Sequence, residues 1–464
     1  MAAILVTGTA MALTYYKLYV EEPAPLCFPG ISDEERGHVD IERRYSTPVV
    51  PLTSSQASEI LRWEQSSHTI GGASGVQRFD TVRVASNSPV EDELVSASGN
   101  EDGAVKWMMW GVFDGHGGWE TSAALHDQLT KYILRELLAA SSNRSITELA
   151  SEDTDKAIFE AFKSLEHDIM EAGIVAVYNA TDYSDGLSRT RPTQAGSCAL
   201  VSYYNCETEI LKVACTGDSR AVLGYRDPDG HLRAIPYSFD QTGKNKDEVA
   251  RLQAAHPNEP NMFDEDGRLM GLMPTRAFGD SYGKWSRPLQ ERVRSRFNGQ
   301  SYPQHSLTPP YITAEPVITT WKINKDCGSF LIMASDGLWD NLTNEQAVDL
   351  VGLWLETHKP SAPIAPADLA QAPTSLVPEQ GQSSVGSEEE NRNYAWTKQA
   401  KEANFVVKDD NAATHLVRNA LGGKDEDMLR GLLTVSSPVS RKMRDDISVQ
   451  VIFFGRDFST IQNN

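Results

Sequence analysis

Short runs of β-branched, aromatic and other apolar residues recur along the chain, and turn residues bound each run. Runs of this kind are typical of β-strands. They cover residues 106–114, 197–204, 208–216, 328–335 and 447–454. Neighbouring runs do not alternate strictly with helical segments, which favours antiparallel pairing over a doubly wound parallel sheet.

Between these runs, apolar residues recur at the period of an α-helix and form one apolar face in each segment. Each such face needs a sheet or another helix to cover it. We therefore predict an α+β fold, with a central antiparallel β-sandwich flanked by helices. The periodic positions are Leu125, Leu129, Ile133 and Leu137, then Ile158, Phe162, Leu165 and Ile169, and later Val348, Val351 and Leu355.

Changes in composition along the chain predict its domain organisation. Residues 1–20 are mostly apolar and lack both the basic start of a secretory signal and the arginines of a transit peptide, so we expect a leader or a membrane anchor. Residues 21–70 are rich in proline, serine and charge, which predicts a tether. The folded domain is expected over residues 71–456, with a disordered insertion at about 359–391 and a tail at 457–464.

The overall composition excludes several classes of protein. Hydrophobic residues make up 40% and charged residues 23% of the 464 positions, which suffices for a sizeable core. With 43 basic and 64 acidic side chains, the formal net charge is −21, so the protein should repel nucleic acid and attract cations. The five cysteines form no Cys-x-x-Cys pair, and none has Arg six positions later, which argues against disulfides, a zinc ribbon or a cysteine phosphatase.

Acidic residues recur at the ends of the predicted strands. Asp114, Asp218 and Asp336 come at or just after the end of a strand, and Asp445 and Asp446 precede the last strand. In an antiparallel sheet the start of one strand lies beside the ends of its neighbours, so these carboxylates can meet at one rim. A single Asp-Gly pair is ordinarily a turn signal. Clustered carboxylates repel one another and imply bound cations, and an all-oxygen set favours Mg²⁺ or Mn²⁺ over zinc.

Six motifs in order resemble those of the metal-dependent, type 2C Ser/Thr protein phosphatases. The likeness runs from about residue 72 to 455, and six ordered motifs are far more specific than any one of them. It implies a hydrolase that removes phosphate from phosphoserine and phosphothreonine of a phosphoprotein. The motifs are VFDGHGG at 112–118, GSCA at 196–199, TGDSRAV at 216–222, RAFGD at 276–280, ASDGLWD at 334–340 and DDISV at 445–449.

Within that family, the chain is most similar to the mitochondrial pyruvate dehydrogenase phosphatases. The likeness rests on FD at 79–80 followed by NSPVED at 87–92, on DQTGKN at 240–245, on YITAEP at 311–316 and on the long insertion. It implies the pyruvate dehydrogenase complex as substrate, with the E1 α-subunit as phosphorylated partner. It also implies a mitochondrial location, in the matrix or at the inner membrane, where residues 1–20 would provide the membrane association.

The resemblance assigns a role to the main acidic residues. Asp114 would bridge two metal ions, the Gly115 carbonyl would bind one of them, and Asp336 and Asp445 would hold the other. The pair, Mg²⁺ or Mn²⁺, would activate a water for direct attack on phosphorus without a covalent enzyme intermediate.

The same resemblance implies further ligands around this pair. Glu91 and Asp92 would hold metal-bound waters. Asp218, Asp336 and Asp340 resemble the carboxylates that bind a third, weaker metal in some members of the family. Asp218 fits a structural role in a turn equally well.

The resemblance also bears on proton transfer and phosphate binding. His116 would protonate the departing Ser or Thr oxygen, and Asp280 is expected to fix a loop near the cleft. Many members carry a phosphate-binding Arg four residues before Glu91, where this chain has Asn87. The Asn87 amide would donate to phosphate without supplying charge, and Arg83 is a candidate substitute for the missing cation.

Three alternatives stay open at this point. A catalytically inactive scaffold of the same fold would be expected to lose ligand carboxylates, whereas Asp114, Asp336 and Asp445 are all present. A type 2C phosphatase with another substrate fits the motifs, because surface loops choose the phosphoprotein. An unrelated metal hydrolase is disfavoured, because the chain has neither His-Glu-x-x-His nor a complete P-loop.

Overall fold

The computed structural model describes residues 50–70, 74–101, 103–142, 144–297, 299, 307–325, 328–358 and 402–455. Backbone contacts separate residues 1–50 from residues 51–464, and the fold described below is that of the second unit. The predicted leader at 1–20, insertion at 359–391 and tail at 457–464 lie outside the described residues. These three assignments therefore stay predictions.

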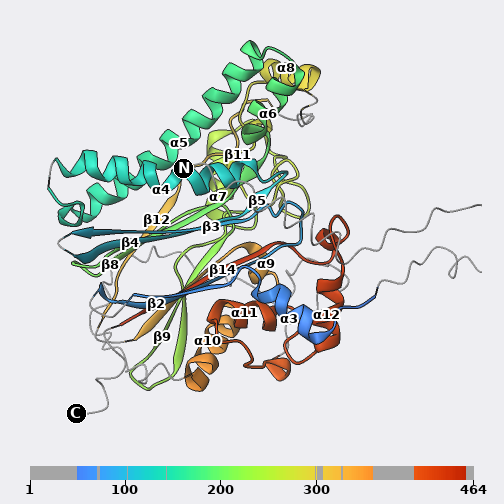
Figure 1. Ribbon diagram of the computed structural model, residues 1–464. Helices are drawn as coiled ribbons and strands as arrows, with labels where there is room; N and C mark the ends of the chain where they lie inside the picture. Colours follow the sequence, from blue (N-terminus) through green and yellow to red (C-terminus); the bar gives the residue numbers. More distant parts are fainter. Residues whose placement is uncertain are drawn as a thin grey trace, which may run out of the picture. The chain divides into compact units, whose positions relative to one another are not determined.

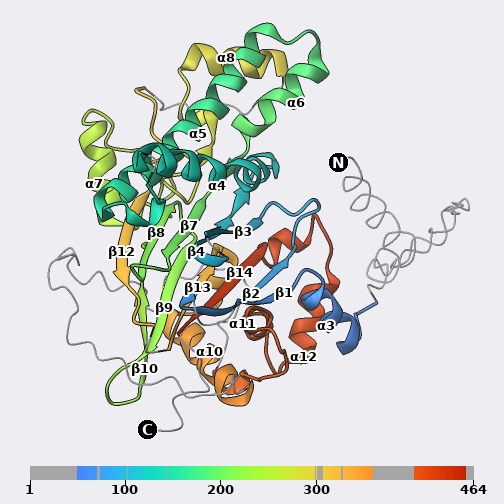
Figure 2. The ribbon, with the colours of Figure 1, turned by 60° about the vertical axis from the view of Figure 1, so that its left-hand side comes forward.

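Two large antiparallel sheets form the centre of this unit (Figures 1 and 2). In spatial order, the first sheet consists of β1 (Ser66–Thr69), β2 (Val76–Val84), β14 (Ile447–Phe454), β13 (Ser329–Ala334), β9 (Arg220–Arg226) and β10 (Leu232–Pro236). The second consists of β12 (Val317–Lys322), β8 (Ile210–Thr216), β7 (Ala199–Asn205), β4 (Ala104–Phe113) and β3 (Glu93–Glu101). A small third sheet consists of β11 (Phe278–Gly279), β6 (Gly196–Ser197) and β5 (Gly115–His116).

Apolar side chains from both large sheets fill the space between them. Trp110 of β4 and Phe454 of β14 meet edge to face, with ring centroids 6.4 Å apart. Tyr204 of β7 contacts the same Phe454 ring at 5.1 Å. β14 is buried at every position, because the other sheet covers one of its faces and helices cover the other. Strands buried on both faces read as nearly continuous apolar runs, which is why the sequence pattern reveals them.

Helices cover the outer face of each sheet, so the sandwich has four layers (Figure 1). The apolar faces predicted from the sequence lie against the sheets. On the second sheet lie α4 (Glu120–Ser141) and α5 (Ser151–Asn179). On the first lie α3 (Ser54–Arg62), α9 (Asp336–Trp339), α10 (Asn344–His358), α11 (Ala412–Ala420) and α12 (Glu426–Thr434). Short 3-10 turns are η3 (Ile146–Glu148), η4 (Ser281–Gly283), η5 (Glu402–Asn404) and η6 (Ser440–Lys442).

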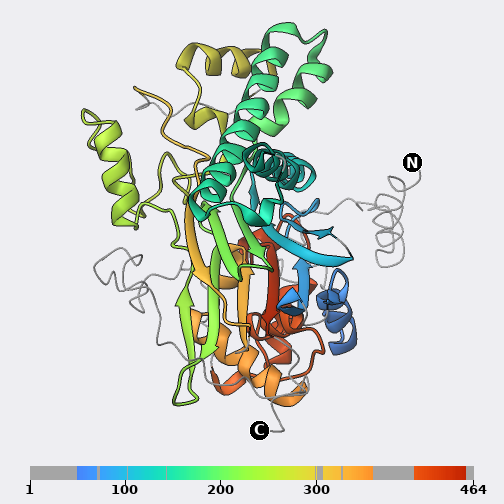
Figure 3. The same ribbon diagram turned by 90° about the vertical axis from the view of Figure 1, so that its left-hand side faces the viewer.

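A helical arm extends from the second sheet (Figure 3). The C-terminal half of α5 packs there against α6 (Tyr183–Gln194) and α8 (Arg287–Phe297), through a separate apolar cluster that includes Val177, Trp285 and Phe297. α7 (Lys246–Ala255) belongs to the long connection between β10 and β11 and contributes to a further small cluster.

The predicted fold class, an α+β fold with an antiparallel sandwich flanked by helices, is confirmed. The five predicted strands correspond to β4, β7, β8, β13 and β14, and the three periodic segments to α4, α5 and α10. The sequence pattern missed six strands of the two large sheets, namely β1, β2, β3, β9, β10 and β12. Of these, β3 and β12 are the edge strands of the second sheet and carry polar residues at exposed positions, so they lack a continuous apolar run.

The prediction that residues 21–70 form a tether is wrong for its C-terminal part. α3 begins after a capping box in which Thr53 and Gln56 satisfy each other's backbone N–H groups. Leu61 of this helix is fully buried, and β1 pairs with β2. The proline and serine content before the helix concealed one short amphipathic segment, whose single buried face spans too few residues to show a clear period.

Truncation of Leu61 tests whether α3 belongs to the folded unit. Leu61→Ala is expected to lower the free energy of unfolding by about 2–5 kcal/mol, because the side chain is lost from a closed core. Trp63 is 68% exposed, so Trp63→Ala should change it by about 0.5 kcal/mol or less. Urea titration followed by circular dichroism measures both. Equal losses in the two variants would contradict the docking of α3.

Candidate active site

One rim of the sandwich gathers carboxylates from both sheets. β4 and β8 of the second sheet end just before Asp114 and Asp218, and β13 of the first sheet ends just before Asp336. One ligand oxygen from each of these three side chains lies within 4.8 Å of the other two. The backbone N–H of Asp336 also donates to Asp114 Oδ2 at 3.2 Å. The structure therefore confirms that these three carboxylates meet at one rim.

The start of β14 brings two more carboxylates to the same rim. β14 runs antiparallel to β13, with Ala334 opposite Val449, so the residues before β14 lie next to those after β13. Burial, and next the charge of Asp336, raise the pKa of Asp445 to about 7. Asp445 and Asp336 are thus within electrostatic reach of each other, as the sequence predicts.

Crowding raises the pKa values of the other carboxylates as well. Burial, followed by the charges of Asp336 and Asp92, raises the pKa of Asp114 well above its ordinary value. Burial, followed by the charge of Asp446, raises the pKa of Asp92 well above its ordinary value and also raises the pKa of Glu91. Ionised carboxylates in such a cluster become stable only when positive charge is added.

Asp446 organises the loop that carries Glu91. Its Oδ1 accepts hydrogen bonds from the N–H groups of Ser86 and Asn87 at 2.5 and 2.9 Å, and its Oδ2 accepts one from the N–H of Glu91 at 2.8 Å. The Asn87 side chain donates to Glu91 Oε2 at 3.0 Å. The sequence pattern places Asp446 at the rim only as the neighbour of Asp445 and does not reveal this anchoring role. Its pairing with a loop about 360 positions away left no signal in the sequence.

Gly115 allows two backbone segments to meet at the rim. A Cβ atom at this position would lie 2.1 Å from the carbonyl oxygen of Glu91 and 2.9 Å from Ser122 Oγ, so any other residue would displace the backbone. Ser122 Oγ donates to the same Glu91 carbonyl. The carbonyl predicted to be a metal ligand therefore belongs to a segment whose position is fixed from both sides.

His116, on β5, pairs with a buried carboxylate from a distant segment. His116 Nε2 lies 2.8 Å from Asp280 Oδ2. Burial alone would lower the pKa of His116, but the carboxylates of Asp280 and Asp218 outweigh it, so the pKa is raised. A Cβ atom on Gly196 would lie 2.1 Å from His116 Nε2 and 2.4 Å from Asp280 Oδ2. The glycine of the GSCA motif therefore leaves the space that this pair occupies.

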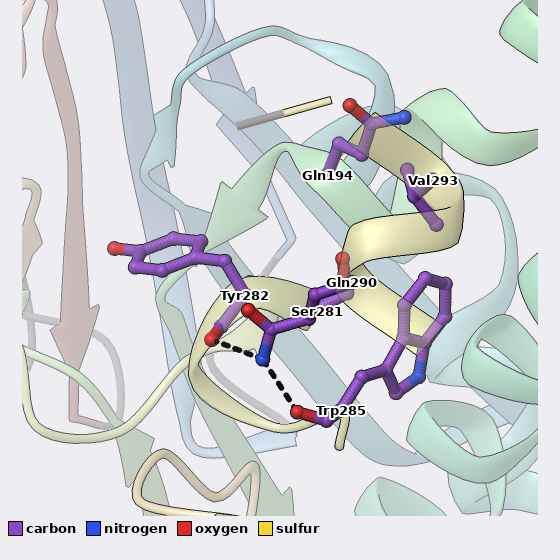
Figure 4. A pocket seen from close by; sticks show the side chains of 6 residues that line it. All are labelled: Gln194, Ser281, Tyr282, Trp285, Gln290 and Val293. Carbon is purple, nitrogen blue, oxygen red and sulfur yellow. Dashed lines mark hydrogen bonds between the residues drawn. The ribbon is translucent and has the colours of Figure 1, made fainter. Parts of the chain in front are cut away.

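The turn after Asp280 is held by the helical arm. Asp280 has left-handed backbone angles, φ 50° and ψ 47°, and η4 begins directly after it. Gln290 of α8 donates to the carbonyls of Tyr282 at 2.9 Å and Trp285 at 2.5 Å (Figure 4). Asp280 is thus supported from outside the sandwich, and so is the His116 ring with which it pairs. The small cavity beside this turn is lined by Gln194, Ser281, Tyr282, Trp285, Gln290 and Val293 (Figure 4).

The donor set suits divalent cations. Asp92 Oδ2 is buried and has no hydrogen-bond partner at ordinary bonding distance among the described residues, so a cation or a water molecule would satisfy it. Asp114, Asp218 and Asp336 offer only oxygen, the ligand type of Mg²⁺ and Mn²⁺. Asp340 lies one helical turn after Asp336, and the group of described carboxylates within 4.8 Å does not include it.

The basic residue at this rim is not the one that the sequence suggested. Arg83 forms ion pairs with Glu64 at 2.6 Å and with Glu93 at 2.7 Å. The guanidinium that pairs with a predicted metal ligand is that of Arg441, whose partner is Asp445. Arg441 did not stand out in the sequence. Asp445 lies outside η6, so the pair depends on how the chain turns between η6 and β14, which the spacing of four residues alone does not reveal.

Comparisons with known proteins decide the family. The family model described as Protein phosphatase 2C matches residues 78–377, and a protein phosphatase 2C homolog of Schizosaccharomyces pombe is 41% identical over 387 residues, covering 82% of this chain and 81% of the relative. The chain belongs to the protein phosphatase 2C family. The mitochondrial [pyruvate dehydrogenase [acetyl-transferring]]-phosphatase 1 of Saccharomyces cerevisiae is 35% identical, covering 88% of this chain and 74% of the relative. The solved serine-threonine phosphatase 2C from Toxoplasma gondii has a TM-score of 0.47 at 15% identity, covering 84% of this chain and 99% of that one.

As a phosphatase 2C, the chain is a protein-serine/threonine phosphatase, a phosphoric monoester hydrolase of a metal-dependent family. It retains Asp114, Asp336 and Asp445, the carboxylates that an inactive scaffold would be expected to lose. Within the part of the chain that the structure describes, no helix combines the length and the apolar character needed to cross a membrane.

The raised carboxylate pKa values predict how pH affects the metal-free phosphatase. The pKa of Asp445 rises from 3.8 to about 7 on folding, so its folded form holds a proton that the unfolded form has released. The stability that this group contributes is complete below about pH 4 and is lost as the pH rises through about 7. Bound Mn²⁺ favours the ionised form, so it should raise the melting temperature more at pH 7.5 than at pH 5.5.

Melting curves in EDTA and in Mn²⁺ at the two pH values measure this difference. The quantity compared is the rise in melting temperature from EDTA to Mn²⁺ at each pH. Carboxylates elsewhere in the protein contribute equally with and without Mn²⁺, so their contribution cancels. Asp445→Asn should make this rise in melting temperature depend less on pH, because the titrating group is removed. Equal increments at both pH values in the wild type would contradict the prediction.

Proposed function

We propose that this phosphatase hydrolyses phosphoserine and phosphothreonine in the pyruvate dehydrogenase complex and that it uses a pair of Mg²⁺ or Mn²⁺ ions. The observation that carries the proposal is the meeting of Asp114, Asp218 and Asp336 within 4.8 Å. Asp114, the carbonyl of Gly115, Asp336 and Asp445 would hold the ions. When bound, such a pair lowers the pKa of a water molecule and offsets charge on the phosphoryl oxygens.

The remaining carboxylates would organise the surroundings of the ions. Glu91 and Asp92 would accept hydrogen bonds from water in the site, and the three N–H groups bound by Asp446 fix the loop that carries Glu91. Asp218 would contribute to a third, weaker metal position, supported by its closeness to Asp336. Asp340 would join it only through a shift of its side chain toward Asp218.

His116 would act as the general acid. A general acid must hold its proton at the working pH and release it to the departing Ser or Thr oxygen. The Asp280 carboxylate keeps His116 protonated to higher pH, since it raises the pKa of the imidazole against the effect of burial. Asp280 acts here as a positioning residue, because it contacts the imidazole and not the substrate.

The proposed substrate and location derive from relatives. Proteins of Saccharomyces cerevisiae and Bos taurus that are 35% and 31% identical to this chain are named mitochondrial pyruvate dehydrogenase phosphatases. We extend that assignment to this chain, with the E1 α-subunit as phosphorylated partner and the mitochondrial matrix as location. The relative from Schizosaccharomyces pombe bears only the family name, so a type 2C phosphatase with another substrate is the alternative that a substrate comparison must address.

Removal of one carboxylate tests the metal mechanism. Asp114→Asn should lower the rate on phosphorylated pyruvate dehydrogenase by roughly a thousandfold, because an amide replaces the ionised ligand shared by both metal positions. EDTA should abolish the wild-type rate, and Mn²⁺ or Mg²⁺ should restore it. Phosphate release from the phosphorylated E1 α-subunit measures both effects.

Asp127→Asn is the matched control for this variant. Asp127 is 69% exposed on α4, so its replacement should leave the rate unchanged. Activity that survives EDTA or Asp114→Asn would refute the metal mechanism. The choice of substrate is tested by comparing unrelated phosphoproteins with phosphorylated pyruvate dehydrogenase. Equal rates on all of them would refute the substrate assignment but not the metal mechanism.

The pairing of His116 with Asp280 predicts a shift in the pH profile. Asp280→Asn removes the charge that raises the pKa of His116, so the imidazole should lose its proton at lower pH. The alkaline limb of kcat should therefore move to lower pH. His116→Gln should lower kcat and remove this limb. An alkaline limb that stays in place in Asp280→Asn would exclude His116 as the general acid.

A further inference from the structure

Most basic side chains near the rim already bind carboxylates or backbone carbonyls of the protein, so they are not available to bind phosphate. Arg191 pairs with Glu120 through two hydrogen bonds of 2.7 and 3.1 Å. Arg220 pairs with Asp240 in the same two-pronged way, at 2.9 and 2.5 Å. Arg444 donates to backbone carbonyls and is buried. Arg83 pairs with carboxylates, as described above.

Asn87 is also engaged. Its side-chain nitrogen donates to Glu91 Oε2 at 3.0 Å and to Asp446 Oδ2 at 3.4 Å. The other atom of the amide is an oxygen, which cannot bind an ionised phosphate because both groups are acceptors. The Asn87 side chain therefore shapes the loop around Glu91 and supplies no charge to the site.

Arg441 combines closeness to the carboxylates with access to solvent. Its side chain is 37% exposed and pairs with Asp445. Burial lowers the pKa of Arg441, but the charges of Asp445, Asp336 and Asp114 outweigh it and raise that pKa. The same guanidinium counteracts the rise in the pKa of Glu91. Arg441 thus interacts with four of the predicted metal-binding side chains from a position that a substrate can reach.

The backbone holds Arg441 on the same side of the rim as Asn87. Arg441 lies in η6, where the neighbouring Ser440 side chain donates to the carbonyl of Ser86. Asp446 accepts hydrogen bonds from the N–H groups of Ser86 and Asn87. Ser440 therefore links η6 directly to the loop where many family members carry their phosphate-binding Arg, and Asp446 links the residues just before β14 to the same loop.

The partner of Arg441 explains how its guanidinium becomes available. Asp445 is a predicted metal ligand, and a divalent cation competes with the guanidinium for the same carboxylate oxygens. A guanidinium that loses this partner keeps its positive charge and its forked donors, which match two oxygens of a phosphate. A lysine would keep the charge but not the fork.

We propose that Arg441 binds the phosphoryl oxygens of the substrate and so replaces the arginine that is missing at Asn87. The inference rests on the proposed function of the rim as a metal-dependent phosphatase site. Arg441 would reach the phosphate from η6, a different element from the loop at residues 85–91.

Binding of inorganic phosphate to the full-length, Mg²⁺-loaded protein tests this proposal by calorimetry. Arg441→Gln should weaken phosphate binding by about tenfold or more, because charged hydrogen bonds are lost. Arg441→Lys should weaken it less. In a second titration, Mn²⁺ should bind the EDTA-stripped Arg441→Gln protein at least as tightly as the wild type, because a competitor for Asp445 has been removed.

Arg189→Gln is the matched control, since Arg189 is 42% exposed and pairs with an aspartate, Asp185, on α6. It should leave both titrations unchanged. The proposal is overturned if Arg441→Gln binds phosphate as tightly as the wild type, or if it loses Mn²⁺ affinity in parallel, because Arg441 then only supports Asp445. A wild type that fails to bind phosphate overturns it too. Turnover of a phosphopeptide by the wild type separates this proposal from the proposed function. If the wild type does not turn over the peptide but still binds phosphate in a way that depends on Arg441, only the proposed function is rejected.

Discussion

Repulsion among buried carboxylates is the constraint on which the site depends. The fold holds Asp92, Asp114 and Asp445 close enough to raise one another's pKa values, and it can do so because each follows or precedes a strand locked into a sheet. The two sheets are tied together beside the rim by Gln450, whose side-chain nitrogen donates to the carbonyls of Val95 and Gly111 at 3.1 and 2.9 Å. Core packing therefore offsets an electrostatic cost that bound cations relieve, which couples metal binding to stability.

The carboxylates of the rim differ in how their oxygens are satisfied, and this difference separates structural from functional groups. Both oxygens of Asp446 accept backbone hydrogen bonds, so this carboxylate is anchored within the protein. Asp92 keeps one buried oxygen without a partner among the described residues. Anchored carboxylates fix backbone segments, whereas unsatisfied ones need a ligand from outside. Asp446 and Asp92 thus have different roles at the same rim, and only the structure distinguishes them.

The sequence predicted the sandwich and the rim because both follow from local rules. Apolar runs mark strands buried on two faces, and antiparallel pairing then brings the residues after β13 next to those before β14. The contact of His116 with Asp280 spans 164 positions and depends on how the helical arm packs, so no local pattern predicts it. α3 was missed because a single buried turn has too few residues to show a period. Arg441 was missed for another reason, since its pairing with Asp445 depends on how the chain turns between η6 and β14.

The net charge of −21 sets a further condition on how the site works. A net charge of this sign repels a phosphate group at long range, so attraction for the phosphate must come from charges at the rim itself. Without cations, Arg441 is neutralised by Asp445 and the rim remains strongly acidic. Cations at the rim change both features together, because they offset the carboxylates and compete for the partner of Arg441. Phosphate binding should therefore follow metal binding in order, and the ion pair between Arg441 and Asp445 is the contact through which one event prepares the other.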